Sequence, residues 1–134
     1  MKNIITLILF AFIVSMNLNY ASAQDASQPQ MKILKPKVLA ADLIFSYQIL
    51  NTIELRGSEV DALIEVKNIL KPYLEKIQKD NVPLNNAVMF DIPAPVASNL
   101  LQFMERGKFA GADAEKYKRF VDGIIEAAKA VENK

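Results

Sequence analysis

Residues 38–55 read VLAADLIFSYQILNTIEL, a strongly apolar stretch that contains neither glycine nor proline. Its length and the lack of these two residues favour a helix over a strand. Four apolar residues recur at helical spacing along one face: Leu39, Leu43, Tyr47 and Leu50. Because further apolar residues widen this face, we expect the helix to lie at the centre of the core.

A second amphipathic helix is predicted from Glu59 to about Lys79. Its apolar residues follow spacings of three, four, three and four: Leu63, Val66, Leu70, Tyr73 and Ile77. This spacing is typical of a helix that packs along one side. Proline lacks the donor N–H and crowds the preceding turn, so Pro72 predicts a kink or a break near Lys71.

The junction between these two helices contains Arg56, Gly57 and Ser58. Gly57 is predicted to take the left-handed conformation that ends many helices, which makes it the turn of a helical hairpin. Ser58 and Asp61 have the spacing of a capping box, with Ser58 as the first cap of the second helix.

Two more helices are predicted at Val96–Arg106 and at about residues 112–131. Residues 87–92 (AVMFDI) have a strand-like composition, but a lone strand has no partner, so we expect an extended, partly buried loop. The expected fold class is therefore all-α. Four main helices form two helical hairpins, with an irregular extended segment between the hairpins.

The two predicted helix pairs align with each other at an offset of 54 residues. Gln48 then falls on Gln102 and Gly57 falls on Gly111, while acidic and apolar positions fall on residues of the same kind. An internal repeat would give hairpin turns at Gly57 and Gly111 and a pseudo-two-fold axis. Only these two pairs among those that define the pattern are identical, so chance similarity between amphipathic helices is the alternative.

Residues 1–23 have the three parts of a secretory signal peptide. Lys2 supplies the positive end, an apolar run follows, and small residues at Ala21 and Ala23 precede Gln24 as the cleavage site. The sequence thus predicts an exported protein, periplasmic or extracellular.

The alternative to cleavage is a membrane anchor that stays attached, since residues 3–24 carry no charge. Residues 24–37 contain Pro29, Pro36 and several polar side chains, and we interpret them as a linker. The remaining residues, 38–134, are predicted to form a single helical domain.

The composition excludes several kinds of chemistry. The chain has no Cys and no His, so a disulfide scaffold, a Cys/His zinc site, a Cys nucleophile and a His base are all impossible. The four glycines are dispersed and form no phosphate-binding loop. Asp42 and Asp91 are the more isolated acids, each flanked by apolar residues. A buried acid there would have a raised pKa and could be functional, whereas the alternative, which we favour, is an exposed or helix-capping aspartate. We therefore expect no enzyme, no cofactor and no metal.

The remaining interpretation is a protein that acts by binding. The net charge of +1 gives no electrostatic reason to expect nucleic acid. The expected partner is another protein or a component of the cell envelope, with membrane contact only through an uncleaved signal segment. The alternative is a carrier of an apolar small molecule, with aromatic residues at helical spacing lining an interhelical pocket. Those aromatic residues are Tyr47, Tyr73, Phe103, Phe109, Tyr117 and Phe120.

Overall fold

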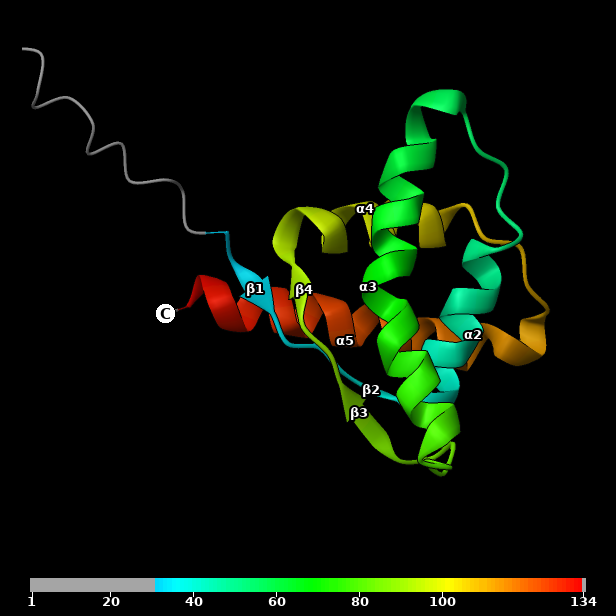
Figure 1. Cartoon of the computed structure of the whole chain (residues 1–134), viewed down its shortest axis with the longest axis vertical. Coiled ribbons are helices and arrows are strands. Elements are labelled where there is room, and N and C mark those ends of the chain that lie inside the picture. Colours follow the sequence, from blue (N-terminus) through cyan, green and yellow to red (C-terminus); the bar gives the residue numbers. More distant parts are fainter. Residues whose placement is uncertain (1–30, 134) are drawn as a thin grey trace, which may run out of the picture. The chain divides into compact units, whose positions relative to one another are not determined.

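The structure is a computed structural model that describes residues 31–133 (Figure 1). The predicted signal peptide, with its cleavage site at Ala21, Ala23 and Gln24, lies outside the described residues, and so do residues 24–30 of the predicted linker. The described residues belong to one folded unit.

The described part of the chain is mostly helical, with four α-helices and two short strand pairs. In chain order its elements are β1 (Ile33–Leu34), β2 (Lys37–Leu39), α2 (Ala40–Leu50), the 3₁₀ turn η1 (Gly57–Glu59), α3 (Val60–Lys79), β3 (Ala87–Met89), β4 (Ile92–Pro93), α4 (Ala94–Glu105), the 3₁₀ turn η2 (Gly111–Asp113) and α5 (Ala114–Glu132). The prediction of a mainly helical fold with four helices is confirmed, whereas the strands are an addition that the all-α class did not include.

The two strand pairs correct the prediction that residues 87–92 form an unpaired loop. β3 pairs antiparallel with β2, and β4 pairs antiparallel with β1. Val38 lies opposite Val88, and Leu34 lies opposite Ile92. The prediction was wrong because the partner strands β1 and β2 lie far away in the sequence, at the start of the folded unit. They are two and three residues long, too short to show an alternating strand pattern.

The same pairs shorten the predicted linker. Residues 31–37 lie within the segment 24–37 that we interpreted as a linker, yet they include β1 and the first residue of β2. Leu34 and Pro36 are buried. The folded unit therefore starts at Met31 rather than at Val38.

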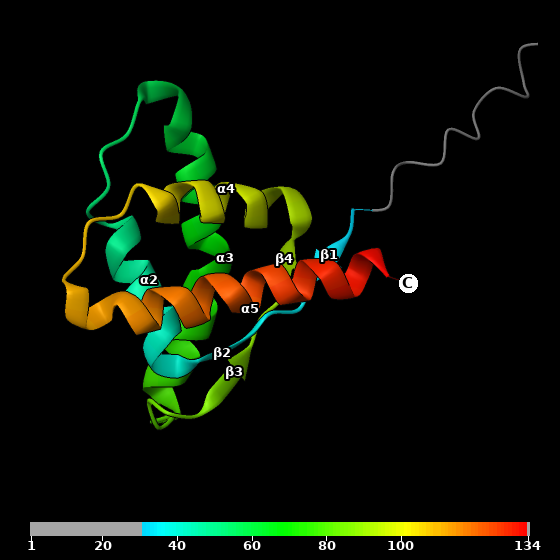
Figure 2. The same cartoon turned by 180° about the vertical axis from the view of Figure 1, so that it is seen from behind.

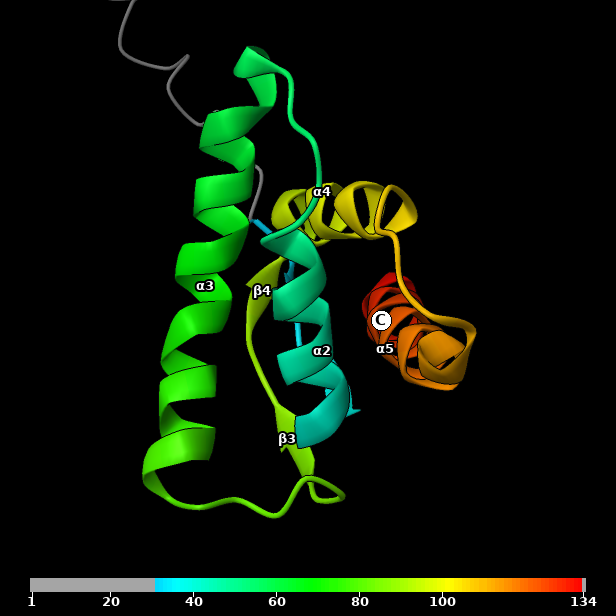
Figure 3. The same cartoon turned by 90° about the vertical axis from the view of Figure 1, so that its right-hand side faces the viewer.

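The four helices pack crosswise around one core. α2 packs against α5 and α3 packs against α4, while α2 also runs alongside α3 (Figures 2 and 3). The side chains at the centre are at most 1% exposed and come from all four helices: Leu43, Leu50, Val66, Leu70, Leu100, Met104, Phe120 and Ile124. No helix in the described part of the chain combines the length and the hydrophobicity that crossing a membrane requires.

α3 is one continuous helix through Pro72, so the break predicted as one of two outcomes near Lys71 does not occur. Pro72 lies on the exposed side of the helix. The carbonyl that would accept its missing N–H belongs to Asn68, which is also exposed, so water can replace the lost hydrogen bond.

The predicted cap between α2 and α3 is also different. No described glycine has a positive φ, so Gly57 is not left-handed; Gly57 and Gly111 instead begin the 3₁₀ turns η1 and η2. The Ser58–Asp61 capping box is replaced by Glu59, whose carboxylate accepts a hydrogen bond from the backbone N–H of Arg56 at 2.8 Å.

Glu59 also links the end of α4 to the segment between α2 and α3. Its carboxylate accepts a second hydrogen bond from Arg106 at the end of α4, at 2.7 Å, and Arg106 donates in turn to the backbone carbonyl of Glu54. The Arg56 N–H and the Arg106 guanidinium favour the charged form and hold the pKa of Glu59 below its usual range.

A lowered carboxylate pKa has a defined effect on stability. It adds stability above the ordinary glutamate pKa of about 4.3, and this contribution is lost as the pH falls through the folded-state value. We expect Glu59→Gln to unfold at lower urea than the parent protein at neutral pH, and the difference to decrease as the pH falls below the ordinary glutamate pKa of about 4.3. Asp61→Asn is the matched control, because Asp61 is exposed and takes part in none of the ion pairs of residues 31–133. A Glu59→Gln difference that does not change with pH would contradict the assignment.

Candidate functional site

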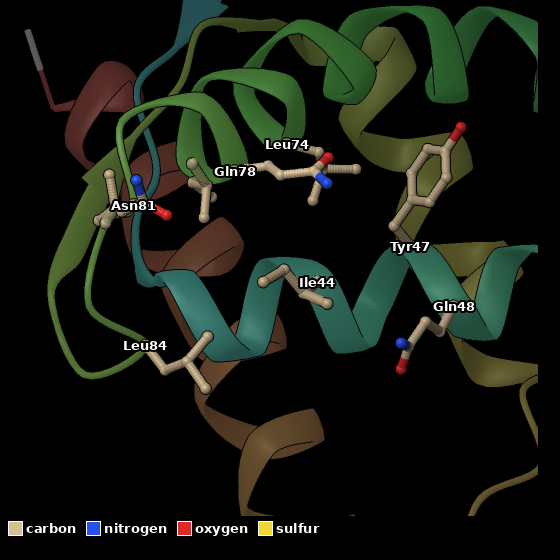
Figure 4. Close-up of a pocket in the computed structure, with 9 residues that line it drawn as sticks. Ile44, Tyr47, Gln48, Leu74, Gln78, Asn81 and Leu84 are labelled. Carbon is tan, nitrogen blue, oxygen red and sulfur yellow. The ribbon is translucent and has the colours of Figure 1, made fainter.

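A pocket of about 620 Å³ opens to solvent between α2 and α3 (Figure 4). Both helices and the chain that follows α3 contribute to it. The residues that line it are Ile44, Tyr47 and Gln48 of α2, Leu74, Ile77 and Gln78 of α3, and Asn81, Val82 and Leu84 of the connection.

Helical periodicity places these side chains together. On each helix the lining residues stand at positions i, i+3 and i+4, which share one face. The other sides of α2 face the core, with Leu43 and Leu50 buried next to the pocket face and Phe45 and Ile49 buried on the far side. The apolar residues of α2 thus extend beyond the core-facing positions and also form one wall of the pocket.

One end of the pocket lies at the C-terminal end of α3. Asn81 is the residue with a positive φ, 48°, among the described non-glycine residues, and it follows the last turn of the helix. The Val82 N–H donates to the Ile77 carbonyl at 3.0 Å, and the Asn81 N–H donates to the Gln78 carbonyl at 3.3 Å. These are the two hydrogen bonds of a Schellman motif, which brings Val82 next to Ile77.

The connection after α3 is tied to the start of α2. The N–H of Ala40 donates to the Asn86 carbonyl at 2.9 Å, and the N–H of Ala41 donates to the Leu84 carbonyl at 3.0 Å. The connection thus satisfies donors that the first turn of a helix leaves free. It also holds Leu84 at the pocket edge, where its side chain is 60% exposed.

The chemistry of the lining is uncharged. Five of its residues are apolar aliphatic, Tyr47 is aromatic, and the polar groups are the side-chain amides of Gln48, Gln78 and Asn81. An apolar surface with a few amides suits a hydrophobic group that carries little or no charge inside the pocket.

The predicted aromatic pocket is mostly core. Tyr47 lines the pocket, but the other five aromatic residues do not. Phe90 stacks on Phe120 at 6.5 Å between ring centroids and packs against Tyr73 at 5.8 Å. A second cluster joins Phe109 to Phe45 and Tyr117. Burial and the nearby Glu105 carboxylate raise the pKa of Tyr117.

The two isolated acids have different surroundings. Asp91 is exposed and pairs with Lys35 at 2.9 Å. Asp42 is fully buried, and its two carboxylate oxygens accept hydrogen bonds from Arg119 of α5 at 2.8 and 2.9 Å. This bidentate contact raises the pKa of Arg119. A smaller, more polar pocket of about 390 Å³ lies beside the pair.

The remaining sequence candidates lie elsewhere. Gly57 and Gly111 are exposed in their 3₁₀ turns and do not line the large pocket. Within residues 31–133, no group of three or more acidic side chains is arranged to hold a metal ion. The residues that sequence reasoning missed are Asn81, Val82 and Leu84, because their position depends on the Schellman turn and on contacts with α2.

Comparison with known proteins gives no relative: no family model, no curated protein and no solved structure matches this chain.

Proposed function

We propose that this is a small exported protein, periplasmic or extracellular, that acts by binding a protein or an envelope partner. The pocket between α2 and α3 is the proposed binding site, and it receives an apolar part of that partner. The observation that carries the proposal is an uncharged, largely apolar pocket that stays open to solvent. The export part rests on the predicted signal peptide, residues 1–23, with cleavage between Ala23 and Gln24.

A second candidate function is the transport of a free apolar small molecule. The pocket volume supports it, since ligand pockets commonly measure about 300–1,000 Å³. Its open side places it second, because a carrier protects its ligand best in an enclosed cavity.

The experiment that tests the site fills the pocket. Ile44 contributes to the pocket wall and is only partly buried, so Ile44→Trp is expected to occupy the space without disrupting the core. We expect the purified protein to capture a protein or a lipid from envelope extract, identified by mass spectrometry, and Ile44→Trp to lose that component.

Ser98→Trp is the matched control. Ser98 is exposed on α4 and stands 54 residues after Ile44 in the chain, outside the pocket. It adds the same indole to a helix surface and should capture the component as the parent does. Equal capture by both variants, with unchanged circular dichroism, would show that the pocket is not the binding site. Capture of a lipid alone would favour the carrier.

We also infer that the described chain consists of two copies of one unit, each ending in a helical hairpin. Adding 54 to the bounds of α2, η1 and α3 gives 94–104, 111–113 and 114–133, and the observed elements α4, η2 and α5 span 94–105, 111–113 and 114–132. The turns at Gly57 and Gly111 therefore occupy equivalent places, as an internal repeat requires.

The strand pairing supports the same inference. Shifting the Leu34–Ile92 pair by 54, forward for one residue and backward for the other, gives Val88 and Val38, which are partners in the second strand pair. The hydrogen bond from Ala40 N–H to Asn86 has a counterpart from Ala94 N–H to Lys32, at 2.9 and 2.8 Å. Each strand pair thus contains one strand from each copy, as a pseudo-two-fold axis predicts.

A further inference from the structure

One end of the pocket between α2 and α3 lies next to a positive charge. Figure 4 shows Tyr47 and Gln48 at one end of the pocket and Asn81 and Leu84 at the other. The ammonium group of Lys67 lies 5.5 Å from the centre of the Tyr47 ring, a cation–π contact. Lys67 is partly buried and stands two turns before Leu74 on α3.

The charge of Lys67 is not neutralised by a carboxylate. Among the ion pairs of residues 31–133, none includes Lys67. The next lysine on the same face, Lys71, pairs with Glu75 at 3.8 Å. Lys67 can therefore pair with an anion from outside the protein at the Tyr47 end of the pocket.

The lining at the other end of the pocket contains no charged side chain. Val82 and Leu84 line it together with the amide of Asn81, and the lining between the two ends is aliphatic except for the amides. Lys67 is not part of this lining, but its contact with Tyr47 places a cation beside the Tyr47 end of an uncharged surface. This polarity matches a single hydrocarbon chain that terminates in an anionic group.

We propose that the pocket binds a free single-chain amphiphile with a carboxylate headgroup, the chain lying toward Leu84 and the carboxylate pairing with Lys67. The proposal rests on the pocket being the binding site and names a ligand class for the second candidate function, the binding of a free small molecule. A single chain, rather than a bilayer lipid, is the committed ligand because the pocket is one groove between two helices, bounded at its far end by the connection after α3.

Three probes that share one chain test the headgroup preference: dodecanoate, dodecanol and dodecyltrimethylammonium. Each is titrated below the concentration at which it forms micelles or, for dodecanol, below its solubility limit, and binding is followed by calorimetry. We expect dodecanoate to bind with a Kd about fivefold lower than dodecanol, and the cation to bind most weakly. The advantage of dodecanoate should decrease with added salt.

The variant Lys67→Met separates the contribution of the headgroup charge to binding from that of the hydrocarbon chain. It keeps an unbranched side chain but removes the ammonium group, so it should abolish the preference for dodecanoate and leave the dodecanol Kd unchanged. Lys76→Met is the matched control, because Lys76 is exposed on the same helix and lies half a rotation away from Lys67. It should preserve the preference.

Each contrary outcome has a distinct meaning. Equal Kd values for dodecanoate and dodecanol in the parent protein would overturn the headgroup assignment, while the pocket remains a binding site. Failure of all three probes, or binding that survives Ile44→Trp, would overturn the ligand class, and the capture experiment with Ile44→Trp and Ser98→Trp would still decide the proposed function. Binding to phosphatidylglycerol vesicles with the same dependence on Lys67, and no binding of dodecanoate, would assign the site to bilayer lipid and contradict the proposal.

Discussion

Arg119→Met is expected to destabilise the fold, with a clearly lower urea midpoint than the parent protein at neutral pH. The substitution keeps the length of the side chain but removes the guanidinium that donates two hydrogen bonds to Asp42. Asp42 is fully buried, so its carboxylate would remain in the core without a partner. An uncompensated buried charge costs far more than the pair contributes when it is intact.

A double variant attributes this loss to the charge. Adding Asp42→Val to Arg119→Met should restore the stability to within about 1 kcal/mol of the parent, because replacing a buried ion pair by apolar residues is often neutral. Val96, which the proposed repeat makes equivalent to Asp42, is an apolar residue buried on α4. A double variant as unstable as Arg119→Met alone would contradict the explanation.

Gly107→Ala is expected to destabilise the protein by about 2 kcal/mol. Gly107 follows α4, and a Cβ atom added there would lie 2.4 Å from Cγ2 of Ile49 and 3.1 Å from the carbonyl oxygen of Met104. Ile49 is 4% exposed and branched at Cβ, so its side chain has little freedom to move aside. The two segments must therefore separate, which opens the core between α2 and α4.

Gly111→Ala is the matched control for this prediction. A Cβ atom at Gly111 would meet nothing within 4 Å, and its φ is not positive. The added methyl group restricts the unfolded chain and should stabilise the protein by about 0.5 kcal/mol. Thermal unfolding of both variants gives the comparison, and a destabilised Gly111→Ala would mean that the 3₁₀ turn at this position depends on glycine after all.

The helices could be predicted because each has a local cause. The apolar positions of α3, from Leu63 to Ile77, follow a helical period that the sequence shows directly, and the buried residues of the helix are members of that set. The strands could not be predicted in the same way. β1 and β4 are two residues long, so neither contains enough alternation to be recognised without its distant partner.

For the candidate site too, the helices could be predicted but their contacts could not. Ile44 and Tyr47 were part of the predicted apolar helix, and Leu74 and Ile77 belong to the second helix. Their meeting across a pocket depends on how α2 lies against α3, which side-chain periodicity alone does not determine. The ion pair of Asp42 with Arg119 joins α2 to α5, and only the folded chain reveals that an acid on an apolar face has a cation opposite it.

The interlocked strand pairs have a consequence for how the polypeptide acquires its structure. β1 pairs with β4 and β2 pairs with β3, so neither strand pair can form until residues 87–93 in the later half of the chain have been synthesised. Contacts between distant residues slow folding, because the intervening loop must be ordered first. Residues 33–39 of a nascent chain therefore stay without their strand partners until residues 87–93 have been synthesised.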